Sequence, residues 1–198
     1  MITLKFDADL IRAAMACQAK KDVRYYLQGI LIAKNGDVVG TNGKVLFRGA
    51  HTFNDCDSLP HDIILSIDGT IPASAQSVTV ELSSAGPCAT GIARIDTNKC
   101  FSCYIIDGKY PQYQLVIVPR LPVTGTYSNV HVFDLEVLGR MGAVFGKNAH
   151  VALYCGYKSD ALRIECLGKP DWVFIAMPFR ADVPDTIMLF SAPLAEAA

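Results

Sequence analysis

Apolar and polar residues follow two different periods along this chain, and the switches between them mark out the predicted elements. Residues 2–6 alternate between apolar and polar side chains, which is the pattern of a half-buried strand. Asp7 is a suitable N-cap for a helix over residues 8–20. One face of that helix is apolar and comprises Leu10, Ala13, Ala14 and Cys17. The chain therefore opens with a strand and an amphipathic helix.

Short apolar runs separated by turn signals follow this helix. Residues 25–33 are apolar and rich in strand formers, and Asn35-Gly36 is a tight-turn signal before a return strand over residues 38–41. A second signal, Asn42-Gly43, precedes a strand over residues 44–48. This succession predicts an antiparallel meander.

A second round repeats this order with a weaker helix. Residues 62–67 form an apolar strand, and Pro72 suits the first turn of a helix within residues 69–76, where only one or two turns fit. Further strands are expected over residues 78–82, 91–96, 100–106 and 114–118, with the turn GKYPQY before the last of them.

A third round is short. A strand over residues 129–132 leads to Asp134, an N-cap for a helix over residues 135–146. The predicted apolar stripe comprises Leu135, Leu138, Gly142 and Phe145, and the opposite face comprises Glu136, Arg140, Ala143 and Lys147. Strands follow over residues 150–155, 161–166 and 172–177. Few helices and antiparallel strand patterns indicate the α+β class.

Composition and charge narrow the functional classes. The 198 residues are 51% hydrophobic and 19% charged, and the net charge of -1 excludes a wholly basic surface while leaving room for a local basic patch. No apolar run is long enough to span a membrane, and the N-terminus lacks the order of a signal peptide, so we expect a cytoplasmic protein with no membrane partner.

The chemistry-bearing residues predict neither an enzyme nor a cofactor. Cys100 and Cys103 form a lone CxxC without a second ligand pair, so buried or half-buried thiols are favoured over a metal site. The four histidines lie in no nucleophile elbow, zinc-protease pattern or phosphate-binding loop.

Three stretches resemble the sliding clamp of bacterial replicative DNA polymerases. VRYYLQGILI with GDVVGTNGKVLF is similar to the start of the clamp's middle domain, where an RYYLNG-type strand leads to a TDGHRL-type turn. IIDGKYPQYQLVIVP is similar to the GRFPDY-type turn, and WVFIAMPFR to the C-terminal VMPMRL-type strand. The shared order covers over half of the chain, and its shortness and divergence suit a phage or mobile element.

The resemblance implies a DNA-clamp fold, with antiparallel sheets outside and a few helices lining the inner face. Such clamps are homo-oligomeric rings that encircle duplex DNA without reading its sequence and hold a DNA polymerase or clamp loader through short peptide motifs. The DNA-binding residues implied here are Arg12, Lys20, Lys21, Arg24, Arg140 and Lys147. The peptide-binding pocket would comprise Leu27, Thr41, Gly43, Lys44, Leu46, Pro119, Met177, Pro178, Phe179 and Arg180.

The departures from the family bear on specificity and assembly. Lys44 and Val45 stand where the family has a His-Arg pair, so the preferred peptide is expected to differ. We expect a full clamp-like domain over residues 1–122, half of a domain over 123–181 and a tail over 182–198. Four copies with three rounds each would complete a ring of the usual size, so a tetramer is predicted, with a trimer as the alternative.

Several alternatives stay open from the sequence alone. The basic residues also fit ordinary solvated charges, and Leu27, Leu46 and Phe179 also fit a hydrophobic core. The whole chain fits a clamp-fold protein that binds and modulates a host clamp, clamp loader or polymerase without encircling DNA. The tail contains an apolar cluster, residues 187–190, and the segment 186–190 resembles the family's own partner motif, which suits either docking into the pocket or packing on a sheet edge.

Overall fold

The computed structural model describes residues 1–51, 59–119, 133–155 and 161–178. The elements, in chain order, are β1 (Ile2–Asp7), α1 (Ala8–Cys17), the 3-10 helix η1 (Tyr25–Gln28), β2 (Ile30–Ile32), β3 (Asp37–Thr41), β4 (Val45–Ala50), β5 (Ile63–Ile67), β6 (Ser77–Leu82), β7 (Thr90–Ile95), β8 (Cys100–Ile105), the 3-10 helix η3 (Tyr113–Leu115), α2 (Leu135–Phe145), β9 (Val151–Cys155), β10 (Leu162–Cys166) and β11 (Lys169–Ala176).

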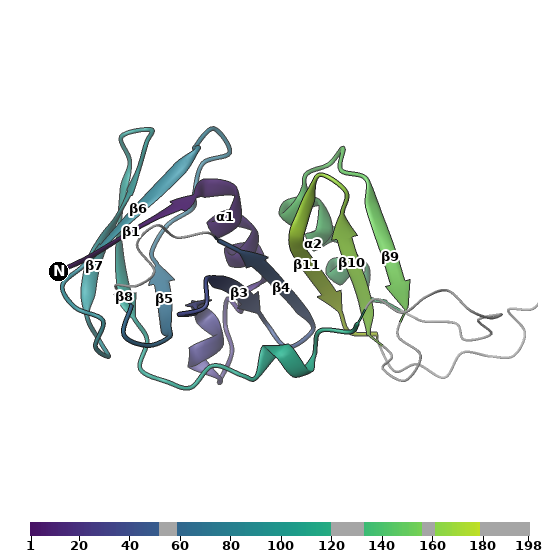
Figure 1. Ribbon diagram of the computed structural model, residues 1–198, viewed down its shortest axis with the longest axis horizontal. Helices are drawn as coiled ribbons and strands as arrows, with labels where there is room; N and C mark the ends of the chain where they lie inside the picture. Colours follow the sequence, from purple (N-terminus) through teal and green to yellow (C-terminus); the bar gives the residue numbers. More distant parts are fainter. Residues whose placement is uncertain (52–58, 120–132, 156–160, 179–198) are drawn as a thin grey trace, which may run out of the picture.

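Within the described residues, the eleven strands form one sheet in the order β1-β6-β7-β8-β5-β2-β3-β4-β11-β10-β9 (Figure 1). Neighbouring strands in this order pair antiparallel, as the alternating patterns predict. Two strands pair with strands of another round. β1, from the first round, pairs with β6, and β5, from the second round, pairs with β2. This exchange binds the first two rounds into one body.

Alternation along the strands builds the core. Leu4 and Phe6 of β1 lie opposite Val80 and Val78 of β6, and all four side chains are buried. Lys5, between them, points to the other face of the sheet and is exposed. Burying each large apolar side chain contributes about 1.5–3 kcal/mol, so the alternating pattern fixes which face of the sheet turns inward.

Helix α1 forms where it is predicted but ends earlier. The Asp7 side chain accepts a hydrogen bond from the Asp9 backbone N–H at 2.8 Å, as an N-cap does. The predicted stripe Leu10, Ala13, Ala14 and Cys17 is buried. The helix stops at Cys17 because the chain then turns back toward η1, where the Ala19 N–H donates to the Leu27 carbonyl at 2.9 Å.

Helix α2 packs on a different face from the predicted one. Asp134 caps its start and Gly146, with φ of 92°, follows its end. Leu135 is 82% exposed, whereas Val137 and Val144 are buried together with Phe145. The predicted stripe is therefore wrong in part, because α2 lies against both α1 and β11, and Val137, Val144 and Phe145 are the residues that join the shared core.

Strand β11 joins the third round to the first through β4. Phe174 lies opposite Phe47, and the rings of Trp172 and Phe47 meet edge to face with centroids 5.0 Å apart. Phe145 of α2 packs edge to face on Phe174 at 6.3 Å. The junction is therefore a continuous part of the core and brings α1 and α2 together on one side of the sheet (Figure 1).

Three predicted elements are wrong or only partly correct. Residues 25–33 begin with η1, and only Ile30–Ile32 pairs as a strand. Residues 114–118 contain η3 instead of a strand, because Tyr113 and Val116 pack inward from a segment that crosses the sheet. Residues 69–76 form no helix; the Ala75 N–H closes one turn on the Pro72 carbonyl, while Ile71 and Ala75 fill the core.

Other predictions fall on residues outside the described ranges. These are the strand over residues 129–132, the domain limits near residues 122 and 181, and the tail over residues 182–198. Among the described helices, none is long and apolar enough to cross a membrane.

The contact between α1 and β3 predicts a sharp dependence on Gly40. A Cβ added at Gly40 would lie 2.0 Å from the Ala14 carbonyl oxygen of α1, and two backbone segments cannot give way as a flexible side chain can. We expect Gly40→Ala to lower the free energy of unfolding by about 1–3 kcal/mol or more, measured by urea denaturation.

Gly139→Ala is the matched control for this substitution. A Cβ at Gly139, within α2, meets nothing within 4 Å. Because alanine is the better helix former, this variant should gain up to about 1 kcal/mol. Equal stability of the two variants would contradict the packing described for α1.

Candidate functional site

A small apolar pocket lies where β4, β11 and the segment after β8 meet. It has a volume of about 170 Å³ and is lined by Arg24, Leu27, Thr41, Gly43, Val45, Leu46, Pro111, Tyr113, Val116, Ile175 and Met177. These residues come from three segments that are far apart in the sequence. Ligand cavities in proteins typically measure roughly 300–1,000 Å³, so this pocket suits one or two side chains of a peptide better than a whole small molecule.

The turn between β3 and β4 forms one wall, and its own hydrogen bonds fix it. Gly43 has φ of 87°, a conformation that glycine adopts without strain. The Thr41 hydroxyl donates to the Val45 carbonyl at 2.6 Å and accepts from the Gly43 N–H at 3.1 Å. The Asn42 side chain accepts from the backbone N–H groups of Lys44 and Val45. This wall is therefore preformed.

The opposite wall is the segment that contains Pro111, Tyr113 and Val116. The Tyr113 hydroxyl donates to the Asp37 carboxylate at 2.6 Å, and the Arg48 guanidinium holds the other oxygen of that carboxylate at 2.6 Å. Burial, together with the hydrogen bond to Asp37, raises the pKa of Tyr113 to about 12. Tyr113 therefore stays protonated at neutral pH and keeps donating.

Arg24 forms the polar edge of the pocket. Its guanidinium binds the Asp22 carboxylate at 2.7 Å, and its NH2 group lies 3.4 Å from the Asn42 carbonyl. The side-chain hydrogen bond from Arg24 lowers the pKa of Asp22 to about 2, so this carboxylate is ionised at neutral pH. The edge thus pairs a cation and an anion beside an apolar interior.

The structure brings together half of the predicted pocket residues. Leu27, Thr41, Gly43, Leu46 and Met177 line it, as the motifs suggest.

The other predicted pocket residues lie elsewhere or fall outside the described ranges. The Lys44 side chain extends to Asp134 at 3.9 Å, while its backbone carbonyl accepts from the Met177 N–H at 2.9 Å. Pro119 and Pro178 are not among the lining residues. Phe179 and Arg180 fall outside the described ranges.

Six lining residues are missing from the predicted pocket: Arg24, Val45, Pro111, Tyr113, Val116 and Ile175. Ile175 could have been found from strand alternation, because it lies two residues before Met177 on the same face. Pro111 and Tyr113 lie within the GKYPQY turn, but no local pattern places that turn against β3 and β4.

The arginines predicted to bind DNA are held within the protein. Arg12 binds the Asp9 carboxylate at 2.5 Å and the Pro72 carbonyl at 2.9 Å. Arg140 binds the Glu136 carboxylate at 2.8 Å and donates to the Ala16 carbonyl at 2.9 Å. That carbonyl lies at the end of α1, where backbone acceptors lack helical partners, so Arg140 joins the two helices.

The lysines predicted to bind DNA differ from these arginines in their exposure and pairing. Lys20, Lys21 and Lys147 are exposed and form no ion pair with another described residue. Their charges are therefore available to a partner.

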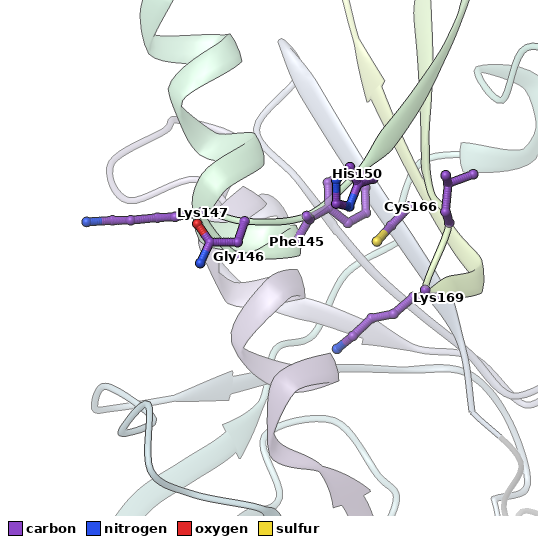
Figure 2. Close-up of a pocket in the computed structure, with 10 residues that line it drawn as sticks. Phe145, Gly146, Lys147, His150, Cys166 and Lys169 are labelled. Carbon is purple, nitrogen blue, oxygen red and sulfur yellow. The ribbon is translucent and has the colours of Figure 1, made fainter.

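A wider hollow of about 550 Å³ lies at the C-terminal end of α2, against the turn between β10 and β11. In Figure 2 the Lys147 side chain points away from His150 and Cys166, into solvent, while Lys169 comes from the opposite side. The Lys169 ammonium lies 3.2 Å from the Asp9 carboxylate and 3.8 Å from the centre of the Trp172 ring. Of these two lysines, Lys169 is therefore paired within the protein, whereas Lys147 forms no ion pair with another described residue.

Metal-ligand chemistry has no support in the part of the chain that the structure describes. No group of three or more His, Cys, Asp or Glu side chains is arranged there to hold an ion. Cys103 is buried, as predicted, whereas Cys100 is exposed.

Comparison with solved structures identifies the fold. The DnaN sliding clamp (DNA polymerase III subunit beta) of Pseudomonas aeruginosa bound to griselimycin matches with a TM-score of 0.62 at 17% sequence identity. Structures of the DNA polymerase III subunit beta and of the sliding clamp with ligand from this organism match with TM-scores of 0.61 and 0.63, both at 17% identity.

Each of these matches covers 91% of this chain and 66% of the clamp, just under two thirds of its length. No protein-family model and no curated protein matches the sequence. The chain therefore has the sliding-clamp fold, which confirms at the level of fold the resemblance predicted from the three motifs.

The hydrogen bond between Tyr113 and Asp37 predicts that Tyr113→Phe destabilises the protein. Asp37 is a buried carboxylate and would lose one of its donors, at a cost of about 1–3 kcal/mol in the free energy of unfolding. Tyr104→Phe, on the exposed face of β8, is the control and should change stability by less than about 0.5 kcal/mol. Urea denaturation measures both, and equal effects would contradict the role assigned to Tyr113.

Proposed function

We propose that this chain is a DNA sliding clamp, a processivity factor that encircles duplex DNA as a homo-oligomeric ring and tethers a DNA polymerase through the pocket at the β4–β11 junction. The observation that carries this proposal is the convergence of Leu46, Tyr113 and Met177, one from each of the three clamp-like stretches, on one preformed apolar pocket. A ring confined to DNA keeps a tethered polymerase at high effective concentration and needs no catalytic residue.

The pocket is suited to capturing an apolar anchor from an extended peptide. Val45, Leu46, Val116 and Ile175 supply an apolar interior, and burial of one or two anchor side chains there provides most of the binding energy. The Arg24–Asp22 pair at the edge offers both a donor and an acceptor to the flanking peptide backbone. The partners proposed are motifs of a polymerase and of a clamp loader.

Sequence-neutral DNA contact would come from the side of the sheet that carries α1 and α2. Lys20 and Lys21 follow α1, and Lys147 follows α2, so available cations lie beyond the C-terminal ends of both packed helices. Each cation that neutralises a phosphate releases counterions, which binds duplex DNA without base readout. We propose Arg12, Arg24 and Arg140 as supporting groups, because their guanidiniums already bind carboxylates.

A tetramer is the proposed ring, with a trimer as the alternative. The tetramer rests on the count of three rounds in one chain, whereas the 66% of the matching clamps' length that the chain spans favours the trimer, because three copies of two thirds equal the two clamps of a dimeric ring. The absence of a helix over residues 69–76, within the described part of the chain, leaves the second round without a lining helix.

That missing helix favours a second candidate function. A clamp-fold protein could keep the peptide pocket and act on a host clamp, clamp loader or polymerase without encircling DNA. The pairing of three of the six predicted cations with carboxylates points the same way.

Peptide capture predicts that Met177→Glu abolishes most of the affinity for a polymerase-derived peptide. Met177 lines the pocket and is 41% exposed, so the protein should still fold while a carboxylate enters the apolar interior. Fluorescence anisotropy should show at least about a tenfold rise in Kd, equivalent to 1.4 kcal/mol. Leu115→Glu, 81% exposed on η3 and outside the pocket, is the matched control and should bind normally.

Ring closure predicts retention on DNA that depends on topology. The protein should remain on linear duplex DNA through a salt wash only when both ends are blocked. Lys147→Ala should lower the slope of log K against log salt by about 1, because one phosphate contact is lost. Lys5→Ala, on the outward face of β1, should leave the slope unchanged. Peptide binding together with release from blocked DNA would instead favour the second candidate function, a clamp-fold protein that does not encircle DNA.

A further inference from the structure

The chain leaves the sheet at the edge of the apolar pocket. Strand β11 ends at Ala176, and the next residue, Met177, lines the pocket. The Met177 N–H donates to the Lys44 carbonyl at 2.9 Å, so this point of the chain is bound to the turn that forms one wall. Any segment that follows Met177 is therefore tethered at the mouth of the pocket.

The tail, residues 182–198, contains one cluster of large apolar side chains. The cluster is Ile187-Met188-Leu189-Phe190, whereas Val183 and Leu194 stand singly among small and polar residues. The tail lies outside the described ranges. A pocket of about 170 Å³ accepts one or two side chains, and an aliphatic or aromatic anchor is the type of group that such a pocket binds. The cluster supplies anchors of this type.

The length of chain between Met177 and the cluster allows a return to the pocket. Nine residues, 178–186, separate the two. Fully extended they span about 30 Å, so the chain has enough length to leave the pocket and turn back. A short tether holds a ligand at an effective concentration on the order of 1 mM. A cluster with a Kd of only about 0.1 mM would then fill the pocket roughly ten times as often as not.

The charges of the tail match those beside the pocket. The tail carries Asp182, Asp185 and Glu196 and no basic residue, and without these carboxylates the chain would be net positive. Lys44, on the turn beside Met177, is 66% exposed, and its ion pair with Asp134 is 3.9 Å long. An exposed pair of this length contributes little to stability. Lys44 can therefore pair with Asp185, which lies two residues before the cluster.

We propose that the apolar cluster of the tail, residues 187–190, occupies the pocket of its own chain and competes there with partner peptides. This inference rests on the proposed function, because the tail regulates the pocket that captures those peptides. A partner peptide binds only to the fraction of molecules whose pocket is empty, so the tail raises its apparent Kd roughly tenfold at the occupancy given above. Strong partner motifs still bind, whereas weak ones are excluded.

A synthetic fluorescent peptide of residues 182–198 tests the docking without any other protein. In full-length protein, Leu189→Asp places a charge in the cluster and releases the pocket. Fluorescence anisotropy should then show that the free peptide binds this variant roughly tenfold more tightly than it binds the unaltered chain. Leu194→Asp is the matched control, with the same substitution on the same tail but outside the cluster. It should bind the peptide as the unaltered chain does.

Two further variants locate the binding site of the peptide. Met177→Glu, added to the Leu189→Asp protein, should abolish most of the gain, because Met177 lines the pocket. Leu115→Glu, added in the same way, should keep the gain, because Leu115 lies outside the pocket. Equal affinity of the peptide for Leu189→Asp and unaltered protein would overturn the proposal. A gain that survives Met177→Glu would also overturn it, because the tail would then dock elsewhere, such as on a sheet edge.

A photoreactive group in the cluster gives an independent measurement on the full chain. Phe190→benzoyl-phenylalanine should crosslink on illumination to lining residues such as Leu46, Val116 or Met177, identified by mass spectrometry. The crosslinked product should keep the 21.5 kDa mass of one chain at every dilution. Crosslinks to β9, or products of twice this mass, would contradict docking into the pocket of the same chain.

A polymerase-derived peptide separates this inference from the proposed function. If that peptide binds Leu189→Asp and unaltered protein with the same Kd, the tail does not compete, while peptide capture by the pocket stands. If it binds neither protein while the 182–198 peptide binds the Leu189→Asp variant, the docking of the tail stands and capture of a polymerase fails.

Discussion

The pairing of β4 with β11 is the constraint on which the rest of the described structure depends. Backbone hydrogen bonds between two strands that are far apart in the sequence extend one sheet across the molecule. The same pairing buries Phe47, Trp172 and Phe174 together, so the sheet and the core are closed by one event. It also places Leu46 opposite Ile175, and both of these residues line the pocket. Both the fold and the candidate site therefore depend on the pairing of β4 with β11.

The packing of α1 against α2 follows from this junction, and it decides which of the predicted DNA-binding residues are paired within the protein. Once β11 is beside β4, the two helices share one side of the sheet, and the end of α1 reaches α2. Arg140 then donates a hydrogen bond to the Ala16 carbonyl, which is a partly buried acceptor at a helix terminus and has no partner within its helix. An arginine that pattern alone assigns to a DNA-facing surface thus has a structural task, whereas Lys147, two residues beyond the helix, keeps its charge available.

The segment after β8 adds the specific features of the pocket. Tyr113 crosses to β3 and binds Asp37, and Arg163 of β10 donates to the Val118 carbonyl at 2.5 Å, so the segment is held at both ends. Both contacts use charged or strongly polar groups at low exposure, where such hydrogen bonds are strong and their loss is costly. This wall of the pocket is therefore a crossing connection and not a strand of the sheet.

The sequence by itself determined the features that depend on neighbours within a few residues. Asp7 and Asp134 cap the two helices, and Gly36 and Gly43 take the positive φ that their Asn-Gly turns require. Strand alternation also fixed which residues enter the core, and the motifs located five pocket residues because they preserve local turns and strands. Only the tertiary structure decided that the segment beginning at Tyr113 is a crossing connection, which face of α2 is buried, and which cations remain available. Those outcomes depend on contacts between distant segments, whose energies no local pattern contains.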